Sequence, residues 1–384
     1  MKVAVLSIHP APYRDPVFAA VHRRKNVELH VFTMFDTDRG HPYRGDVVAG
    51  YPHTPLGWGW RLLPHSYVHP GIVAALRRGG FDAVVVPGYN HGTSVLATLF
   101  CCMTGTPLIY SADTTSFVAR PGWRTVLTRI ILKKCGAVWV PGAASREYFS
   151  SLGFRSDLLF EGAYCLDAVR LAQVAARERA CRDSIRAYLE VPEAGFVFLF
   201  AGRMIPERGL DYLVRAFARL VGQQPDAYML LVGDGPLRPQ VVANCRDLPR
   251  VRILDPVAFE QLAGYYAAAD CYVLPCIREP YSLALAQAAI SGLPLITTDK
   301  VGAAADYVRS AASGRVVGAG DSVALEGAMT ELICDRPGAQ AMGRAAQEVA
   351  MRRTVEWAAD QFEQAAFAAL SAPVEQPGLV EGGQ

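Results

Sequence analysis

The chain has 384 residues, of which 51% are hydrophobic, and this length is enough for two domains of ordinary size. A formal net charge of +2 excludes the strongly basic surface of a general nucleic-acid binder. Nine cysteines without a C-x-x-C pair indicate free thiols rather than a disulfide framework. No apolar run reaches the roughly 18 residues of a membrane-spanning helix, and residues 3–8 run into His9-Pro10 too soon for a signal peptide. The composition predicts a cytoplasmic, globular protein.

In the first half, short apolar runs alternate with helical stretches, a pattern typical of a doubly wound α/β domain. Asp15 is predicted to cap a helix with Pro16 at its first position, and further helices are predicted near residues 94, 124 and 143. Strands are predicted at 3–8, 27–32, 83–87, 108–110 and 137–140. The first turn, residues 9–14, has no G-x-G-x-x-G. The fingerprint of a dinucleotide-dependent dehydrogenase is therefore absent.

The loops that follow these strands share one edge of a parallel sheet, and that edge is the expected ligand-binding side. Five residues of these loops are candidate substrate contacts: His9, Tyr13, Arg14, Tyr89 and Asp113. Asp113 either positions a hydroxyl group or acts as a base, or it caps a helix. His9 either contacts the substrate or bonds to the backbone, and the sequence does not separate these alternatives.

Two further segments of the first half stand out. Residues 33–70 form a long insertion rich in Trp and Tyr, which is either substrate-facing or plain packing. Residues 123–134 mix basic and apolar side chains, which favours the solvated face of a sheet-covering helix over a membrane-surface role. Asp36-Thr37-Asp38 has the D-x-D pattern of some metal sites, and His65 and His69 are spaced i, i+4. Neither set is expected to bind a metal.

In the second half, a charged helical stretch at 170–190 is the predicted switch between two domains. Three helical patterns between 323 and 370 close the chain, and strands are predicted at 196–200, 228–232, 251–254, 271–274 and 295–298. The predicted organisation is a Rossmann-like domain at 1–168, a second one at 169–354, a helix at 355–371 that crosses back to the first domain, and a disordered tail at 372–384.

The stretch 275–299 predicts a strand end, a loop, a helix and the next strand. Ser282 is suited to cap the helix, whose first residue is Leu283. The N–H groups at this helix start would form an anion site at the edge of the sheet. Glu279 lies in the same loop. A carboxylate beside an anion site is electrostatically costly, so its presence suggests that it binds a hydroxyl of a sugar.

Arg203 and Arg208 flank the turn after the strand at 196–200. Two guanidinium groups at such a turn suit a diphosphate that no metal neutralises, because each forms forked hydrogen bonds with phosphate oxygens. The alternative is a pair of ordinary surface arginines. The neighbouring anion site favours the diphosphate.

In their order along the chain, several motifs resemble those of retaining glycosyltransferase family 4. They are Gly202-Arg203…Glu207-Arg208-Gly209, Val232-Gly233-Asp234-Gly235-Pro236 and the segments 265–275 and 279–298. The resemblance covers the second half of the chain, whereas the first half matches only loosely. It implies the GT-B fold, in which two Rossmann-like domains face a cleft. It also implies an enzyme that moves a hexose from a nucleotide-diphosphate sugar to an acceptor hydroxyl without a metal or a cofactor.

Carried onto this chain, the resemblance implies a role for each matching residue. Glu279 would hold the transferred sugar and, together with Asp113, is the expected catalytic group. Gln287 would face the ribose. The donor diphosphate would be bound by Gly202, Arg203, Arg208, Ser282 and Leu283. The acceptor or sugar side would include His9, Tyr13, Arg14 and Tyr89.

Three positions depart from the family pattern. Arg208 stands where the family usually has Lys, which keeps the charge but not the compact ammonium group. Gln287 stands where the family usually has the second Glu of its E-x7-E pattern, and an amide binds hydroxyls more weakly than a carboxylate. Many members carry a His near the sugar where this chain offers Ser111 and Asp113. The departures are compatible with reduced activity or with a donor that carries different hydroxyls.

Two other functions stay open at this point. One is a nucleotide-sugar 2-epimerase of the same architecture, and the other is a non-catalytic protein that binds a nucleotide sugar or a partner. The expected partners are a UDP- or GDP-sugar donor and either a lipid-linked glycan or a small-molecule acceptor, with no nucleic acid. The expected location is the cytoplasm, with peripheral contact at the inner face of the membrane as an alternative.

Overall fold

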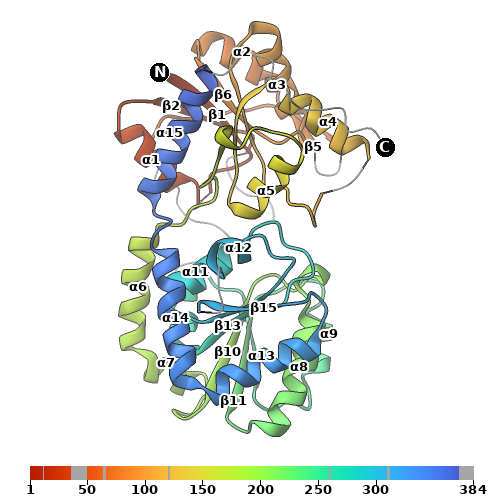
Figure 1. Ribbon diagram of the computed structural model, residues 1–384, viewed down its shortest axis with the longest axis vertical. Coiled ribbons are helices and arrows are strands. Elements are labelled where there is room, and N and C mark those ends of the chain that lie inside the picture. Colours follow the sequence, from red (N-terminus) through yellow and green to blue (C-terminus); the bar gives the residue numbers. More distant parts are fainter. Residues whose placement is uncertain are drawn as a thin grey trace. The chain divides into compact units, whose positions relative to one another are not determined.

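The computed structural model describes residues 1–11, 13–35, 50–63, 66–119, 122–258, 261–308 and 312–371. The chain divides into two compact units, shown in Figure 1. Unit 1 is Met1–Leu166 together with the segment from Val355 onward, and unit 2 is Asp167–Thr354. The tail predicted to be disordered, the D-x-D at Asp36 and the His65 of the histidine pair lie outside the described residues.

Unit 1 is built on a seven-stranded parallel sheet in the order β3-β2-β1-β6-β7-β8-β9. Its strands are β1 (Lys2–Ser7), β2 (Glu28–Thr33), β3 (His53–Pro55), β6 (Ala83–Pro87), β7 (Leu108–Ser111), β8 (Cys135–Trp139) and β9 (Leu159–Phe160). A separate antiparallel hairpin joins β4 (Trp60–Leu63) to β5 (Ser66–Val68). The order reverses between β1 and β6, so the loops after these two strands diverge and leave room at the carboxyl edge.

Helices cover both faces of this sheet, because successive strand residues point to opposite sides. Val3 and Val5 pack in the cluster formed with α1 (Asp15–Arg23) and α15 (Val355–Ser371). Ala4 and Leu6 pack in the cluster on the other side. That side is covered by α2 (Gly71–Gly79), α3 (Gly92–Thr104), α4 (Trp123–Leu132) and α5 (Ala143–Ser151).

The last helix, α15, returns to unit 1 after the chain has completed unit 2. Phe362 packs against Trp139 of β8 with ring centroids 5.0 Å apart. Arg24, just after α1, donates to Glu356 and Asp360 of α15 at 2.5 Å each. Apolar packing and ion pairs together fix α15 across the sheet.

Unit 2 contains a six-stranded parallel sheet in the order β12-β11-β10-β13-β14-β15. Its strands are β10 (Phe196–Ala201), β11 (Ala227–Val232), β12 (Val251–Leu254), β13 (Cys271–Leu274), β14 (Leu295–Thr298) and β15 (Gly314–Val317). The order reverses between β10 and β13. In such sheets ligands bind outside the carboxyl ends of the strands at this reversal.

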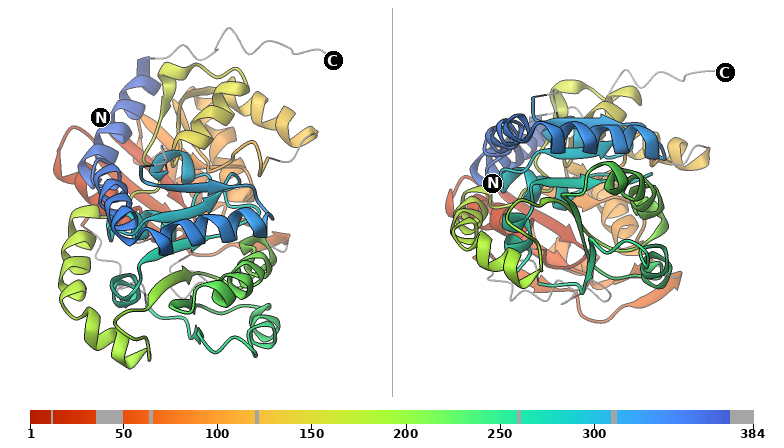
Figure 2. Two further views of the ribbon diagram at one scale, coloured as in Figure 1. Left: turned by 60° about the horizontal axis from the view of Figure 1, so that its bottom comes forward. Right: turned by 90° about the horizontal axis from the view of Figure 1, so that it is seen from below.

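Nine α-helices are described in unit 2, and they cover both sides of its sheet (Figure 2): α13 packs on α8 on one side, and α14 packs on α11 on the other. They are α6 (Ala168–Ala180), α7 (Arg182–Tyr188), α8 (Leu210–Gln223), α9 (Arg238–Asn244), α10 (Leu262–Ala268), α11 (Leu283–Ile290), α12 (Ala304–Tyr307), α13 (Ser322–Cys334) and α14 (Arg336–Ala350). The charged stretch predicted as one helical element is two helices, α6 and α7, which meet at Cys181.

The architecture confirms the predicted α/β class with two Rossmann-like units. The insertion at 33–70 differs from a plain loop, because it contains β3, which extends the sheet beside β2, and the β4–β5 hairpin. Its aromatic side chains divide by role. Tyr51 is buried and donates to Asp15 at 2.7 Å, whereas Trp58 and Trp60 are exposed and pack on each other.

Candidate functional site

The loops after β10 and β13 form the candidate site of unit 2, at the point where the strand order reverses. Gly209 ends the first loop with a left-handed backbone (φ 66°), and a Cβ at this position would lie 2.1 Å from the carbonyl oxygen of Pro275. A Cβ on Gly233, after β11, would lie 2.0 Å from the carbonyl oxygen of Gly202. Only glycine permits these contacts, which explains the glycines of both motifs.

Backbone hydrogen bonds hold these loops together. The Ile277 N–H donates to the Glu207 carbonyl at 2.9 Å, and the Met204 N–H donates to the Asp234 carbonyl at 2.7 Å. The Glu279 N–H donates to the Lys300 carbonyl at 2.9 Å. Hydrogen bonds between loops that follow different strands therefore hold this backbone, which positions the side chains at the edge of the sheet.

Arg208 and Glu279 form an ion pair between the two loops. Their side chains are only 17% and 15% exposed. Burial acts to lower the pKa of Arg208, the Glu279 carboxylate acts to raise it, and the balance lies above the ordinary value. The Arg208 guanidinium also donates to the Cys276 sulfur at 3.5 Å. The structure thus gives Glu279 a cationic partner, which offsets the cost of placing a carboxylate beside an anion site.

Arg203 has a different environment in the same turn. Its side chain is exposed and, within the part of the chain that the structure describes, makes no hydrogen bond or ion pair. The turn therefore carries one guanidinium that is paired within the protein and one that is available to a ligand.

The start of α11 lies in the loop after β13. Ser282 is buried, and its hydroxyl accepts from the Leu285 N–H at 3.3 Å, so it caps α11. Its φ of 111° is unusual for a residue with a side chain and marks local strain of the kind found at ligand sites. Among the described residues, the N–H groups of Ser282 and Leu283 donate to no protein acceptor. They are available to an anion.

Gln287 lies one turn further along α11 and is only 2% exposed. Its role toward a ribose stays a prediction.

Unit 1 contains a cavity of about 430 Å³ at the carboxyl edge of its sheet. Two of the four residues predicted for the acceptor or sugar side, Arg14 and Tyr89, line it together with the predicted catalytic residue Asp113. The rest of its wall combines apolar residues such as Ile8 and Val118 with polar and aromatic ones, including Ser111, Tyr110, Tyr148, Arg124, Thr125, Thr128 and Tyr164. A wall of hydroxyls and aromatic rings is suited to a polyol or a sugar, which offers both hydroxyls and C–H faces.

Asp113 and Arg14 meet in this cavity through Tyr164. The Tyr164 hydroxyl donates to the Asp113 carboxylate at 3.2 Å, and the Arg14 guanidinium lies 5.0 Å from the centroid of the Tyr164 ring. Burial raises the pKa of Tyr164 well above its ordinary value, so the phenol remains a hydrogen-bond donor. Burial acts to lower the pKa of Arg14, nearby tyrosines act to raise it, and the balance lies above the ordinary value.

The structure distinguishes the alternatives left open for two loop residues. Asp113 caps no described helix, because α4 follows Gly122, and its carboxylate lies in the cavity wall. His9 is not part of that wall, and its Nδ1 lies 2.7 Å from the Pro10 carbonyl oxygen. Tyr13 lies behind the wall, with its ring edge-on to Tyr164 at 4.9 Å. Tyr164 itself was not predicted, because it follows the two-residue strand β9, which gives no readable pattern.

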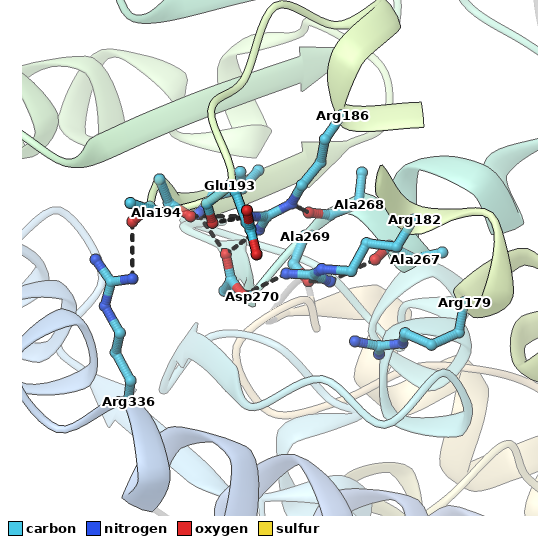
Figure 3. Close-up of polar contacts among 12 residues, drawn as sticks. Arg179, Arg182, Arg186, Glu193, Ala194, Ala267, Ala268, Ala269, Asp270 and Arg336 are labelled. Carbon is cyan, nitrogen blue, oxygen red and sulfur yellow. Dashed lines mark hydrogen bonds and ion pairs between the residues drawn. The ribbon is translucent and has the colours of Figure 1, made fainter. Parts of the chain in front are cut away.

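A second cavity, of about 290 Å³, lies at the opposite edge of the sheet of unit 2, where β10 and β13 begin. Figure 3 shows that its arginines point to partners within the protein. Arg182 and Arg186 each donate to Asp270 at 2.5 Å. They also donate to the Ala269 and Ala268 carbonyls at the end of α10, at 2.9 Å each. This cluster caps a helix and does not resemble a ligand site.

The described residues contain no group of three or more His, Cys, Asp or Glu side chains arranged to hold a metal ion. None of the described helices is both long and apolar enough to cross a membrane.

Comparison with known proteins bears on unit 2 first. Residues 195–335 match the family model described as "Glycosyl transferases group 1", a stretch that runs from β10 to the end of α13. The D-inositol 3-phosphate glycosyltransferase of Nocardioides sp. (strain ATCC BAA-499 / JS614) is 34% identical over 154 residues, which cover 35% of this chain and 33% of that protein. The enzyme of the same name from Corynebacterium diphtheriae is 30% identical over 190 residues, covering 47% and 44%. The chain thus spans less than half the length of these relatives.

Solved structures match the whole chain at low identity. HepE of Anabaena, solved in complex with UDP and glucose, is 18% identical with a TM-score of 0.71, and the match covers 94% of this chain and 98% of that one. Sucrose-phosphate synthase from Thermosynechococcus elongatus is 19% identical with a TM-score of 0.69, covering 95% and 98%. This likeness is one of fold. The chain has the two Rossmann-like units of the GT-B fold, and unit 2 carries a glycosyltransferase group 1 domain.

Proposed function

We propose that the protein is a retaining glycosyltransferase of family 4, which moves a hexose from a nucleotide-diphosphate sugar to an acceptor hydroxyl without a metal or a cofactor. The observation that carries this proposal is the arrangement at the β10–β13 reversal. An available arginine, the Arg208–Glu279 pair and the start of α11 meet there, inside the matched domain. Unit 2 is the proposed donor-binding domain, and unit 1 is the proposed acceptor-side domain.

Arg203, Arg208 and the N–H groups of Ser282 and Leu283 would bind the donor diphosphate, with Gly202 close to it. The leaving diphosphate gains negative charge as the bond to the sugar breaks, so these donors stabilise the transition state more than the ground state. Glu279 would hold hydroxyls of the transferred sugar and Gln287 those of the ribose. HepE of Anabaena was solved in complex with UDP, which supports a UDP-sugar as the donor. A GDP-sugar is the alternative.

In the proposed reaction, the acceptor oxygen attacks the anomeric carbon on the face from which the diphosphate departs. The carbon–oxygen bond to the diphosphate breaks, and the acceptor proton passes to an oxygen of the leaving phosphate. Configuration is then retained without a protein nucleophile. Asp113, with Arg14 and Tyr89 beside it in the cavity of unit 1, would position the acceptor, and His9 and Tyr13 would support the loop.

The acceptor class is proposed from the cavity and from the relatives. A small polyol or its phosphate fits a wall that combines hydroxyls with Arg14 and Arg124, and the names of the curated relatives point to an inositol phosphate. A lipid-linked glycan is the alternative, and the protein would then work in the cytoplasm at the inner face of the membrane.

The test is donor consumption followed by NMR with wild type and Arg203→Ala. Removal of the available guanidinium should lower kcat/KM for the sugar nucleotide about a hundredfold. Losses of this size are typical when an enzyme loses a hydrogen-bond donor that stabilises negative charge developing in the transition state. Arg246→Ala is the matched control, because Arg246 is also exposed and lies away from the site, after α9. Unchanged consumption in Arg203→Ala would sink the proposed donor site.

The same spectra separate the other two functions. Conversion of UDP-N-acetylglucosamine to its 2-epimer with no acceptor present would identify an epimerase. Tight UDP binding with no hydrolysis or transfer across a panel of donors would identify a non-catalytic binding protein.

A further inference from the structure

One side of unit 1 exposes an unusual number of large apolar side chains. Of the nineteen exposed large hydrophobic residues among those the structure describes, eleven lie between Trp58 and Ile130. They come from the β4–β5 hairpin with the residues just before it, from α2, from α3 and from α4. We call the solvent-facing surface of the hairpin, α3 and α4 the apolar face.

Helix α4 carries an apolar stripe flanked by cations. Trp123, Val126 and Ile130 are spaced i, i+3, i+7 and are exposed, Trp123 by 68%. The Arg124 guanidinium lies 5.3 Å from the centroid of the Trp123 ring, and Arg129 is in the last turn. Lys133 and Lys134 follow directly, and the helix contains no acidic residue.

Helix α3 continues the surface. Val95, Leu99 and Met103 are spaced i, i+4, i+8 and are exposed, Met103 by 85%. The helix has no charged residue along its length. Such a stripe turned to water is unfavourable, because large apolar side chains gain stability when they are removed from water.

The hairpin adjoins α3, and α4 lies on the same face of the sheet as α3. Both α3 and α4 contribute to the same core cluster beneath, and they follow the adjacent strands β6 and β7, so they cover the same face of the sheet. Figure 1 shows both helices on that side of unit 1. The hairpin lies on the start of α3, where a Cβ added to Gly92 would come within 2.9 Å of Leu62 Cδ1. Trp58, 75% exposed, extends the face beyond the hairpin.

Positively charged side chains outnumber carboxylates in the segment that forms the apolar face. Residues 53–134 contain eight Arg or Lys but only two carboxylates, Asp82 and Asp113. Asp82 accepts from the backbone N–H of Lys2, and Asp113 lies in the cavity wall. On the opposite side of the same sheet, by contrast, Arg24 is paired with Glu356 and Asp360. The apolar face thus combines large apolar groups with a segment in which Arg and Lys outnumber carboxylates.

We propose that the apolar face is a docking surface for a bilayer that contains anionic lipid. Tryptophans sit at the boundary of hydrocarbon and headgroups, leucine and valine side chains enter the acyl region, and Arg and Lys meet lipid phosphates. A protein partner would require no such excess of one charge. The proposal deepens the proposed function by naming the surface through which unit 1 reaches the membrane, but vesicle binding does not depend on catalysis.

The test is flotation of the full chain with vesicles of phosphatidylcholine containing about 30% phosphatidylglycerol, against phosphatidylcholine alone. Wild type should bind the anionic vesicles at least about tenfold more tightly, and about 0.5 M NaCl should weaken this binding because salt screens it. Val126→Glu/Ile130→Glu should lose at least about tenfold. Val323→Glu is the matched control, because Val323 is 70% exposed on α13 of unit 2, and it should bind as wild type does.

Equal melting temperatures of the variants and wild type establish that folding is not the cause, and donor turnover should be unchanged in all of them. Failure of wild type to bind anionic vesicles, or undiminished binding by Val126→Glu/Ile130→Glu, overturns the proposal. A dimer in light scattering that this double variant converts to a monomer, without vesicle binding, would identify the face as a contact between copies and also overturns it. A failure of the proposed function would instead appear in the Arg203→Ala comparison, which uses no vesicles.

Discussion

Arg208 and Glu279 neutralise each other in the absence of ligand, so each is proposed to change partner when a donor binds. Glu279→Gln removes the carboxylate and leaves Arg208 free for phosphate. We predict that the variant binds the sugar nucleotide about tenfold more weakly, because the sugar hydroxyls then donate to a neutral amide oxygen instead of a charged carboxylate. It should bind UDP, which has no sugar, at least as tightly as wild type does.

Titration calorimetry with the two ligands measures this difference. Equal losses for UDP and for the sugar nucleotide would show that Glu279 acts on the diphosphate or on folding, and not on the sugar.

Tyr164 lies in the wall of the cavity of unit 1, on the proposed acceptor side. Tyr164→Phe removes the hydrogen bond to Asp113 but keeps the aromatic ring beside Arg14. We predict that KM for the acceptor rises at least about tenfold while KM for the donor stays the same, since a hydrogen bond to a charged group contributes roughly 1.5 kcal/mol or more. Initial-rate kinetics with each substrate varied in turn check this. A rise in the donor KM alone would contradict the assignment.

The sequence predicts the roles of residues that belong to a recognisable motif. It does not predict roles that depend on contacts between residues distant in sequence. The Arg208–Glu279 pair forms only because the loops after β10 and β13 adjoin at the reversal of strand order. Asp113 had two interpretations, and the phenol of Tyr164, distant in sequence, distinguishes them. Local sequence carries no record of such partners.

At the scale of elements, α7 is joined to α10 by Arg186, whose side chain is 6% exposed. It donates to Asp270 and to the carbonyls of Ala268 and Gly195 (Figure 3 shows the cluster). Arg186→Met should lower the free energy of unfolding by about 3 kcal/mol, because the Asp270 carboxylate, which is 24% exposed, and several carbonyls lose a buried donor. Arg246→Met, on the surface, should change it by less than about 0.5 kcal/mol.

Chemical denaturation followed by far-UV circular dichroism measures both variants. A loss in Arg186→Met no larger than in Arg246→Met would show that Arg182 alone satisfies Asp270 and the end of α10.

Strands of the two sheets were predictable because strands buried on both faces form continuous apolar runs. The prediction at 271–274 coincides with β13. Among the strands that were missed are β3, β9, β15 and the two strands of the β4–β5 hairpin, each of two to four residues. Their pairing comes from the neighbouring strand or the underlying helix, and so few residues show no period. The break between α6 and α7 at Cys181 was missed for a similar reason, because no proline or glycine marks it.

At the scale of the whole molecule, all five tryptophans lie in unit 1, so tryptophan fluorescence reports the unfolding of that unit. Burial lowers the pKa of three of its histidines, His30, His69 and His91. Below the ordinary histidine pKa of about 6.5, the unfolded chain binds protons that the folded unit does not. The stability of unit 1 should therefore fall as pH falls from about 7.5 to 5.5.

His69→Gln should flatten this dependence, because glutamine can replace the hydrogen bond to Thr93 but does not titrate. Urea titrations followed by fluorescence at the two pH values measure the effect. An identical pH dependence in wild type and variant would mean that His69 contributes nothing to it.

Thermal unfolding of the full chain in the presence of a panel of UDP- and GDP-sugars examines the whole proposal most directly. A ligand that binds only the folded state at about 100 times its Kd adds about 2.7 kcal/mol of stability. We predict that at least one sugar nucleotide raises Tm in wild type, and that Arg203→Ala loses most of this rise while Arg246→Ala keeps it. If no sugar nucleotide raises Tm, or if the rise is undiminished in Arg203→Ala, the arrangement at the β10–β13 reversal is not a donor site.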